Sequence, residues 1–334
     1  MPLISVIVPC YNEQATICLL LEAVSQQTFP IGELEVIIAD GMSTDATRSE
    51  VAAFQETHPE MVIRLIDNPK RVIPAALNCA LAAASGQYII RLDAHSMPSP
   101  EYIERCVENL QTGKGENIGG VWEIQTRGNG LLSRAIALAA AHPFGVGDAR
   151  YRYTDQAGYV DTVPFGAFRR EVFDQYGRFD ENLLTNEDYE FNARLRQNGG
   201  RIWLDPRIRS TYFARPDLAS LMMQYWRYGF WKWQMLRRYP KTLRWRQALP
   251  PLFVSTLLFL LFLAFFISAA RFLLAFLLLL YGLVLVAGSL PAAARSGDIR
   301  LALAVPLAIS TMHLSWGAGF LWSLAATFFR NPKS

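Results

Sequence analysis

Side chains that could do chemistry stand where short apolar runs of the sequence end. They are Tyr11, Asn12 and Glu13, then Asp40, and then Asp93 and His95. Carboxylates and an imidazole at such positions can hold a divalent cation or hydrogen-bond a sugar or a ribose. A separate acidic pair, Glu187-Asp188, precedes an expected helix, and a carboxylate can also act as a general base toward a hydroxyl group.

Short strands must position these side chains. The β-branched run Leu3–Val8, closed by Pro9, is typical of a buried parallel strand. The other expected elements are strands at 35–39, 62–67 and 87–92, helices at about 13–27 and 73–84, and a helix capped by Thr44 or Asp45. This alternation predicts an α/β fold with right-handed crossovers and a mostly parallel sheet. Ligands of such sheets bind beyond the carboxyl ends of the strands, where the polar residues fall.

The bulk composition limits the compartment and the partners. The 334 residues carry a net charge of only +3, which does not indicate nucleic acid as the main partner. The four cysteines show no CxxC pair and no metal-ligand spacing, so we expect reduced thiols in a cytosolic domain. The start of the chain has no basic residue before its apolar run, which favours a strand over a signal peptide.

The C-terminal third is much more apolar. Leu218–Gln247 carries seven Lys or Arg, eight aromatic residues and no acidic residue, which indicates helices at a membrane interface. Three long apolar stretches follow at about 249–270, 272–294 and 301–329, and Arg271 predicts a tight hairpin between the first two. Buried helices of a soluble protein are the alternative, but uncharged runs this long are rare in soluble domains.

This pattern predicts three parts of the chain. They are a catalytic domain at 1–215, interfacial amphipathic helices at 216–247 and a transmembrane anchor at 248–330. By the positive-inside rule, the basic segment holds the catalytic domain on the cytoplasmic side of the inner (plasma) membrane. Three crossings would leave the C-terminus outside.

Four motifs, in order and spacing, resemble glycosyltransferase family 2 enzymes with the GT-A fold over residues 3–215. They are Ser5-Val-Ile-Val-Pro-Cys-Tyr-Asn-Glu13, Asp40-Gly-Met-Ser-Thr-Asp45, Arg91-Leu-Asp-Ala-His95 and Asn186-Glu-Asp188. The resemblance implies a Rossmann-like GT-A domain that uses a nucleotide-sugar donor. It implies a nucleotide site formed by Pro9, Tyr11, Glu13, Asp40 and Asp93. A turn and a helix N-terminus are the alternative interpretation of Tyr11 and Glu13.

The same resemblance implies the catalytic residues and a metal site. Asp188 matches the general base, with Glu187 orienting it, although acidic residues are also common in the first turn of a helix. Asp93-Ala-His95 departs from the DxD motif of the family and resembles the DxH site of polypeptide N-acetylgalactosaminyltransferases. The expected cofactor is a divalent cation, Mn²⁺ or Mg²⁺, and because imidazole ligates Mn²⁺, such a site favours Mn²⁺ over the harder Mg²⁺. Alternatively, Asp93 alone serves as the metal ligand and His95 is a hydrogen-bond partner.

Two further segments resemble acceptor or diphosphate sites. Val163-Pro-Phe-Gly166 is similar to the acceptor-side loop of the family, where Gly166 would let the backbone approach a sugar, or is simply a turn. Gln224-Tyr-Trp-Arg-Tyr228 resembles the QxxRW element of processive synthases, so Gln224 and Arg227 would reach the diphosphate and Tyr228 the acceptor sugar. Contact with a phospholipid headgroup is the alternative for Arg227. His313 inside the third apolar stretch is either functional or bonded to a neighbouring helix.

The layout of the whole chain resembles bacterial exopolysaccharide glycosyltransferases of the succinoglycan type. The resemblance implies inverting, metal-dependent transfer of glucose from UDP-glucose to a lipid-linked saccharide at the cytoplasmic face of the membrane. Transfer directly to polyprenyl phosphate or diacylglycerol and a non-catalytic scaffold of an export complex are the alternatives. A nucleotidyltransferase is disfavoured because residues 9–17 contain no Gly, Lys or Arg for a phosphate loop.

Overall fold

The computed structural model describes residues 2–329, and their contacts divide the chain into two units. The first unit contains the residues up to Glu123 and Tyr153–Tyr212. The second unit contains Ile124–Arg152 and the residues from Phe213 onward. An internal segment of the expected catalytic domain therefore belongs with the apolar helices.

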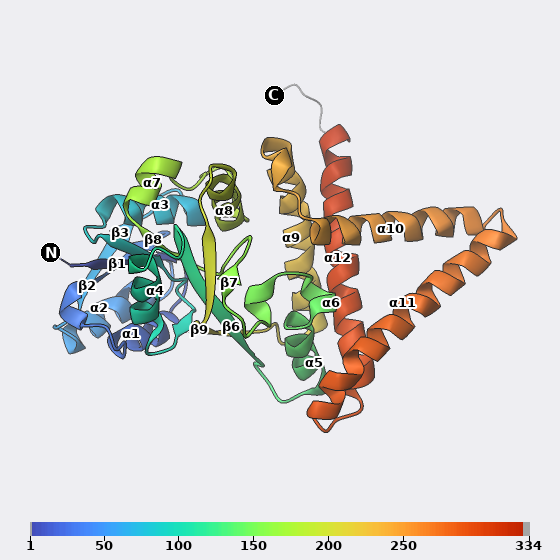
Figure 1. Ribbon diagram of the computed structural model, residues 1–334, viewed down its shortest axis with the longest axis horizontal. Helices are drawn as coiled ribbons and strands as arrows, with labels where there is room; N and C mark the ends of the chain where they lie inside the picture. Colours follow the sequence, from blue (N-terminus) through green and yellow to red (C-terminus); the bar gives the residue numbers. More distant parts are fainter. Residues whose placement is uncertain (1, 330–334) are drawn as a thin grey trace. The chain divides into compact units, whose positions relative to one another are not determined.

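One sheet of nine strands forms the centre of the first unit (Figure 1). The strands are β1 (Ile4–Cys10), β2 (Leu34–Asp40), β3 (Val62–Asp67), β4 (Tyr88–Arg91), β5 (Met97–Pro98), β6 (Asn117–Gln125), β7 (Gly158–Tyr159), β8 (Ala167–Arg169) and β9 (Ile202–Phe213). Their order is β3-β2-β1-β4-β8-β6-β9-β5, and β7 also pairs with β9. The first four strands of this order are parallel, whereas β8 runs antiparallel to both β4 and β6.

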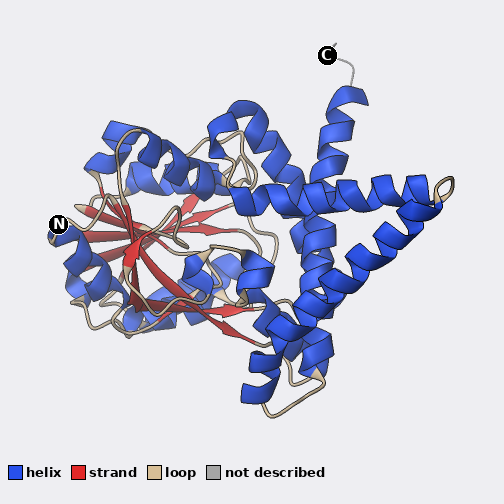
Figure 2. Cartoon of the chain, turned by 45° about the vertical axis from the view of Figure 1, so that its right-hand side comes forward, coloured by secondary structure: helices blue, strands red, loops and turns tan. Residues whose placement is uncertain are grey.

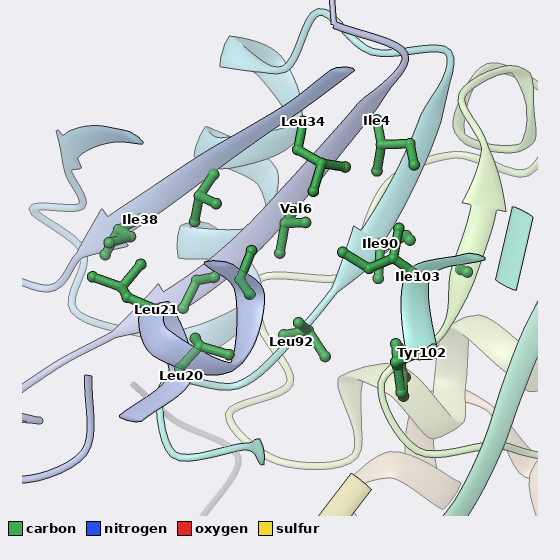
Figure 3. Packing of buried hydrophobic residues seen from close by; sticks show 14 of the residues in the cluster. Ile4, Val6, Leu20, Leu21, Leu34, Ile38, Ile90, Leu92, Tyr102 and Ile103 are labelled. Atoms are coloured by element: carbon green, nitrogen blue, oxygen red, sulfur yellow. The ribbon is translucent and has the colours of Figure 1, made fainter. Parts of the chain in front are cut away.

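Helices pack on this sheet. They are α1 (Ile17–Ser25), α2 (Thr47–Thr57), α3 (Ile73–Ala83), α4 (Tyr102–Gln111), α7 (Glu171–Tyr176) and α8 (Glu187–Gln197), with a 3₁₀ turn at Ile31–Glu33. Every residue of β1 and β2 is buried, which agrees with their mostly apolar sequences. Leu20 and Leu21 of α1 lie beside Val6 of β1 in this core, and α4 contributes Tyr102 (Figure 3).

The strands lie close to their expected ranges, but the first helix is shorter. It begins at Ile17 rather than at 13, because Asn12 has a left-handed backbone (φ 54°) and residues 13–16 form a turn. The next helix begins at Thr47, with neither Thr44 nor Asp45 as its N-cap residue. Asp45 still accepts hydrogen bonds from the Thr47 backbone and hydroxyl, so it supports the first turn from outside.

The second unit is helical. Its helices are α5 (Leu131–Ala140), α6 (Pro143–Val146), α9 (Leu218–Arg238), α10 (Trp245–Ala264), α11 (Ser268–Arg295) and α12 (Leu301–Phe329), with 3₁₀ turns at Arg150–Arg152 and Pro240–Thr242. The expected basic segment is thus α9, a turn and the start of α10. Within residues 2–329, α10, α11 and α12 are long and apolar enough to cross a membrane.

The hairpin between α10 and α11 differs from its expected position. The turn lies at Phe265–Ile267, and Arg271 is inside the first turn of α11 rather than between the helices. The prediction that Arg271 forms the turn was therefore wrong. Phe265 still has helical backbone angles (φ −69°, ψ −27°), but Ile267 is extended (φ −127°, ψ 118°), so α11 begins at Ser268.

Candidate active site

The expected nucleotide residues lie at the carboxyl ends of β1, β2 and β4. Cys10 pairs in register with Asp40, so β1 and β2 end side by side. Glu13, His95 and Asp93 are brought to this edge by the turns that follow β1 and β4, and Oε1 of Glu13 lies 3.1 Å from Nδ1 of His95. Residues 82 positions apart in the chain thus meet, as expected for one site.

Left-handed backbone conformations recur in the loops that carry the expected site residues. Asn12, Met42, Phe165 and Asn186 have φ values of 54°, 60°, 63° and 70°. A non-glycine residue in this region costs of order 1–3 kcal/mol, and such residues concentrate at functional sites. Arg71 (φ 56°), on the loop after β3, adds an exposed cation that was not among the predicted site residues. Its position shortly after an expected strand could have identified Arg71 as a candidate site residue.

Asp40 is enclosed rather than open. Its side chain is fully buried, and it accepts hydrogen bonds from the backbone and hydroxyl of Ser43 and from Arg48. The guanidinium of Arg48 also contacts Asp67, 2.8 Å away. In this arrangement Asp40 orders the loop that follows β2, and Tyr11, 46% exposed, is the open side chain of the neighbouring β1 loop.

Glu13 and His95 form a hydrogen-bonded pair. Burial acts to raise the pKa of Glu13, but hydrogen bonds with His95 and Thr16 outweigh it, so the pKa lies below its ordinary value. Glu13 is therefore a carboxylate at neutral pH, and it orients the ring of His95, whose side chain is 54% exposed. The ring and the carboxylate of Asp93 stand on the same short turn after β4.

The donor set fits a divalent cation that is shared with a substrate. Among residues 2–329, no three His, Cys, Asp or Glu side chains are grouped as a complete metal site. Asp93 and His95 offer one oxygen ligand and one nitrogen ligand. A cation bound by two protein ligands takes its remaining ligands from substrate phosphates and water, as is usual at phosphate-bearing sites.

Arg91 connects this edge to the acidic pair of α8. Its guanidinium lies 3.1 Å from Oδ1 of Asp93 and 3.0 Å from Oε1 of Glu187. The side chains of Arg91 and Glu187 are each only 6% exposed. Burial raises the pKa of Glu187 to about 7; Arg91 opposes this shift, and Asp188 adds to it. Arg91 stands at the start of the Arg91-Leu-Asp-Ala-His95 motif, but its sequence position predicts no role for it.

Asp188 is the accessible member of the acidic pair. Glu187 is buried, whereas Asp188 is partly exposed and accepts a hydrogen bond from the backbone of Tyr189. Both stand in the first turn of α8, where the helix dipole favours negative charge. A carboxylate that must meet an acceptor hydroxyl has to be reachable, so this geometry agrees with Asp188 as base and Glu187 as its support.

Two buried donors near this network have no hydrogen-bond partner within residues 2–329. They are Nη1 of Arg91 and Nδ2 of Asn186, the residue that precedes α8. Leaving a buried donor unsatisfied costs about 1–3 kcal/mol. Donors of this kind at the edge of a parallel sheet fit a site that receives a polar ligand.

Gly166 is held in a position that no other residue could occupy. Its φ is 107°, and a Cβ there would lie 2.7 Å from Oδ1 of Asn117 and from the ring of Phe168. Its carbonyl accepts the backbone hydrogen bond of Arg91, which ties the expected acceptor loop to β4. Gly166 thus serves the local geometry of the site.

A separate cavity of about 410 Å³ opens in the first unit beside β6 and β9. Its lining is Val121, Trp122, Glu123, Tyr153, Thr154, Asp155, Pro206, Arg207 and Arg209. None of the expected site residues lines it.

The QxxRW-like residues lie on α9 in the second unit. Nε2 of Gln224 donates to the hydroxyl of Tyr228, 2.9 Å away, and Arg227 is exposed. His313 of α12 contacts the hydroxyl of Tyr281 and the carbonyl of Phe144, which agrees with the helix-bonding alternative. All four cysteines are free thiols.

Known proteins are similar to this chain in sequence and in fold. A family model described as "Glycosyl transferase family 2" matches residues 5–177. The succinoglycan biosynthesis protein ExoA of Rhizobium meliloti (strain 1021) is 31% identical over 325 residues, covering 94% of this chain and 93% of the relative. A Methanococcus voltae enzyme named dolichyl N-acetyl-alpha-D-glucosaminyl phosphate 3-beta-D-2,3-diacetamido-2,3-dideoxy-beta-D-glucuronosyltransferase is 29% identical over 241 residues, covering 71% and 75%.

A solved structure with a similar fold is the mannosyltransferase PcManGT from Pyrobaculum calidifontis, described in complex with GDP-Man and Mn²⁺. It has a TM-score of 0.64 and 21% identity and covers 96% of this chain and 87% of that chain. The likeness confirms the expected fold class, a GT-A-like, mostly parallel sheet followed by helices.

Proposed function

The chain belongs to glycosyl transferase family 2 and is a glycosyltransferase, and from this premise we propose that it transfers glucose from UDP-glucose to a lipid-linked acceptor. The proposed place of transfer is the cytoplasmic face of the inner membrane, and the proposed role is in exopolysaccharide or glycolipid synthesis. Similarity along almost the whole chain to a succinoglycan biosynthesis protein supports the exopolysaccharide role. The long apolar helices support a lipid-linked rather than a soluble acceptor.

The observation that carries the proposal is the Arg91 bridge. One buried cation contacts both Asp93 of the metal motif and Glu187 next to the proposed base. The leaving group and the attacking hydroxyl must lie on opposite sides of the same sugar carbon. A rigid connection between the residues that serve them fixes that geometry, and correct placement of reacting groups is a major part of enzymatic rate enhancement.

In the proposed reaction, Asp188 accepts the proton of an acceptor hydroxyl while that oxygen attacks the anomeric carbon. The bond from this carbon to the diphosphate oxygen breaks as the glycosidic bond forms, and UDP leaves with the electron pair. One displacement inverts the configuration at the anomeric carbon. Glu187 is buried and holds Arg91, so it positions the site without touching the acceptor.

Asp93 and His95 would hold the divalent cation, Mn²⁺ or Mg²⁺. The cation, when bound, stabilises the charge that collects on the leaving diphosphate. The imidazole of His95, oriented by Glu13, favours Mn²⁺. Pro9 and Tyr11 are proposed to contact the base and ribose, and Asp40 to keep their neighbouring loop in place. Residues proposed for the acceptor and diphosphate are Gly166, Gln224, Arg227 and Tyr228.

Membranes that contain the full chain test the proposal. They are incubated with radiolabelled UDP-glucose, UDP-galactose, UDP-N-acetylglucosamine or GDP-mannose in the presence of Mn²⁺, and lipids are extracted. We expect labelled lipid from UDP-glucose, and its loss in Asp188→Asn without weaker UDP binding. Label found only in soluble material would overturn the proposal that the acceptor is a lipid. Labelled lipid formed from another donor instead would overturn the proposal that the transferred sugar is glucose.

The same assay separates the alternatives. If the label is found on polyprenyl phosphate or diacylglycerol that carried no sugar before the reaction, the acceptor is that lipid rather than a lipid-linked saccharide. A folded chain that releases no nucleoside diphosphate from any donor would indicate a scaffold. An active Asp188→Asn variant would end the assignment of the base.

A further inference from the structure

The three long apolar helices of the second unit are not equivalent. In α10 and α11, only 17% and 11% of the residues in the most apolar stretch are buried, against 56% in α12. Figures 1 and 2 both show α10 and α11 leaving α12 as a hairpin that points away from it, while α12 runs across the base of this hairpin. Helices exposed on all sides need lipid around them, whereas α12 already has protein neighbours.

Those neighbours include a charged helix. α9 packs along α12 in the parallel direction, since Trp226 adjoins Gly319 and, further along both helices, Nε1 of Trp233 donates to the hydroxyl of Thr327. A second polar bond, 2.8 Å long, joins Gln234 to Ser323. The approach is close, because a Cβ on Gly229 of α9 would lie 2.0 Å from the carbonyl oxygen of Trp316. The two helices therefore form one packed pair.

The position of Arg227 limits where the α9–α12 pair can lie relative to a membrane. It is exposed, and it stands near the middle of α9, nine residues from its start and eleven from its end. If α12 crossed the membrane, the parallel α9, about 31 Å long, would cross beside it and carry Arg227 to the middle of the hydrocarbon. A charge there, facing outward from the helix pair, is strongly disfavoured. Along the membrane surface the same arginine reaches water or headgroups.

Segments that carry polar groups also pack against the first half of α12. Arg134 of α5 forms a 3.1 Å ion pair with Asp298, just before α12. The backbone carbonyl of Phe144 contacts His313, 2.8 Å away. These segments belong to 124–152, which the chain enters from β6 and leaves toward β7. A crossing by α12 would draw them into the bilayer too.

One face of α12 remains apolar and exposed. Leu303, Leu307 and Leu314 recur at the spacing of one helix face and are 70%, 49% and 42% exposed. The face turned to α9 carries Gly319, Ser323 and Thr327 instead. A helix with one apolar face and a polar-bonded opposite face fits the plane of a membrane interface.

The cations that flank the helices give an independent argument. Lys241 and Arg244 stand before α10 and Arg246 stands in its first turn; Arg295 ends α11 and Arg300 precedes α12; and positions 330 and 333, after α12, are Arg and Lys. Between positions 247 and 294, which include the turn from α10 to α11, Arg271 is the one Lys or Arg in the sequence. Two crossings place all the flanking cations except Arg271 on one side, whereas a third crossing would carry the last two across, against the positive-inside rule.

We infer that the chain crosses the membrane twice, through the α10–α11 hairpin, and that α9 and α12 lie together along the lipid surface on the catalytic side. α10 has 20 residues, about 30 Å of helix, which matches the hydrocarbon thickness. The end of α12 then lies on the same side as the catalytic unit, not outside as three crossings require. This inference rests on the membrane attachment in the proposed function but not on its donor or acceptor.

Cysteine labelling of the full chain in intact spheroplasts tests it. The native cysteines lie in the catalytic unit, and the partly exposed Cys18 and Cys79 serve as an internal control, because wild-type protein should take up membrane-impermeant maleimide only after lysis. Ser268→Cys, exposed at the hairpin end, should be labelled, and Ser334→Cys, five residues beyond α12, should be labelled only after lysis. Peptide mass spectrometry identifies each labelled site.

Each other pattern overturns the inference. Labelling of both new cysteines means three crossings, and labelling of neither means that the hairpin does not cross. Labelling of Ser334→Cys alone means that α12 crosses while the hairpin does not, and labelling of wild-type protein places the catalytic unit on the wrong side. Lipid-product formation is measured on the same membranes, so failure of the proposed function is recognised separately.

Discussion

Replacing Arg91 by methionine tests whether the buried bridge holds the site together. Methionine fills similar space without a charge. Glu187, 6% exposed, then faces Asp93 and Asp188 without its cation. Breaking a buried ion pair from one side costs about 3–5 kcal/mol. The second contact, to the 27% exposed Asp93, adds at most about 1 kcal/mol because water screens it.

Amide hydrogen exchange of the purified full chain in detergent measures this loss. At pH 8, where wild-type Glu187 is ionised, a loss of about 3 kcal/mol makes exchange in β4 and α8 faster by about a hundredfold. Arg105→Met is the matched control, because Arg105 pairs with Glu108 at an exposed position and its loss costs less than about 1 kcal/mol.

The double variant Arg91→Met/Glu187→Gln decides between a paired and an independent role. Removing the carboxylate removes the uncompensated charge, so we expect the double variant to be more stable than Arg91→Met alone. If the two single effects instead add to within about 0.5 kcal/mol, or if Arg91→Met leaves exchange unchanged, the bridge is not what holds β4 to α8.

Three further predictions concern the metal motif, the sheet and pH. His95→Ala should raise the Mn²⁺ concentration needed for nucleoside diphosphate release by about tenfold with little change for Mg²⁺; unchanged metal dependence would remove His95 from the site. Gly120→Ala should cost about 3 kcal/mol in urea unfolding, because its Cβ would lie 1.7 Å from the carbonyl oxygen of Ile208, while Gly32→Ala, with no atom within 4 Å, should change little. The pKa of Glu187 is about 7 in the folded state and about 4.5 in the unfolded state, so between these pH values the folded state keeps a proton that the unfolded state releases. The free energy of unfolding should therefore fall by up to about 3 kcal/mol as pH rises from 4.5 to 7, and it should then level off. Glu187→Gln should flatten this slope, and a slope that persists in the variant would assign it to another group.

Much of the first unit could be predicted because its signals are local. A short run rich in apolar and β-branched residues predicts a strand, and the residues after it must turn. The third strand was predicted with its observed bounds, Val62–Asp67, and the turn after β1 was predicted to carry Tyr11 and Glu13. Chain order together with the rule for parallel sheets then places such turns at one edge.

Other features could not be predicted, since they depend on pairs that are distant in the chain. Nothing near Arg91 indicates that Glu187, 96 positions later, lies 3.0 Å from its guanidinium. The partnership of His95 with Glu13, rather than with Asp93, likewise follows from how β1 and β4 are placed side by side.

By itself, the sequence determined the chemistry that is available: which side chains follow the strands, which segments are too apolar for water, and which family the motifs resemble. Tertiary structure decided how these groups act together. It buried Glu187 and left Asp188 open, and it enclosed Asp40. It also placed a charged helix along α12, a helix whose composition alone reads as a membrane span. The reason is that apolarity and helix length are properties of one segment, whereas burial, pKa and lipid exposure depend on the neighbours that only folding supplies.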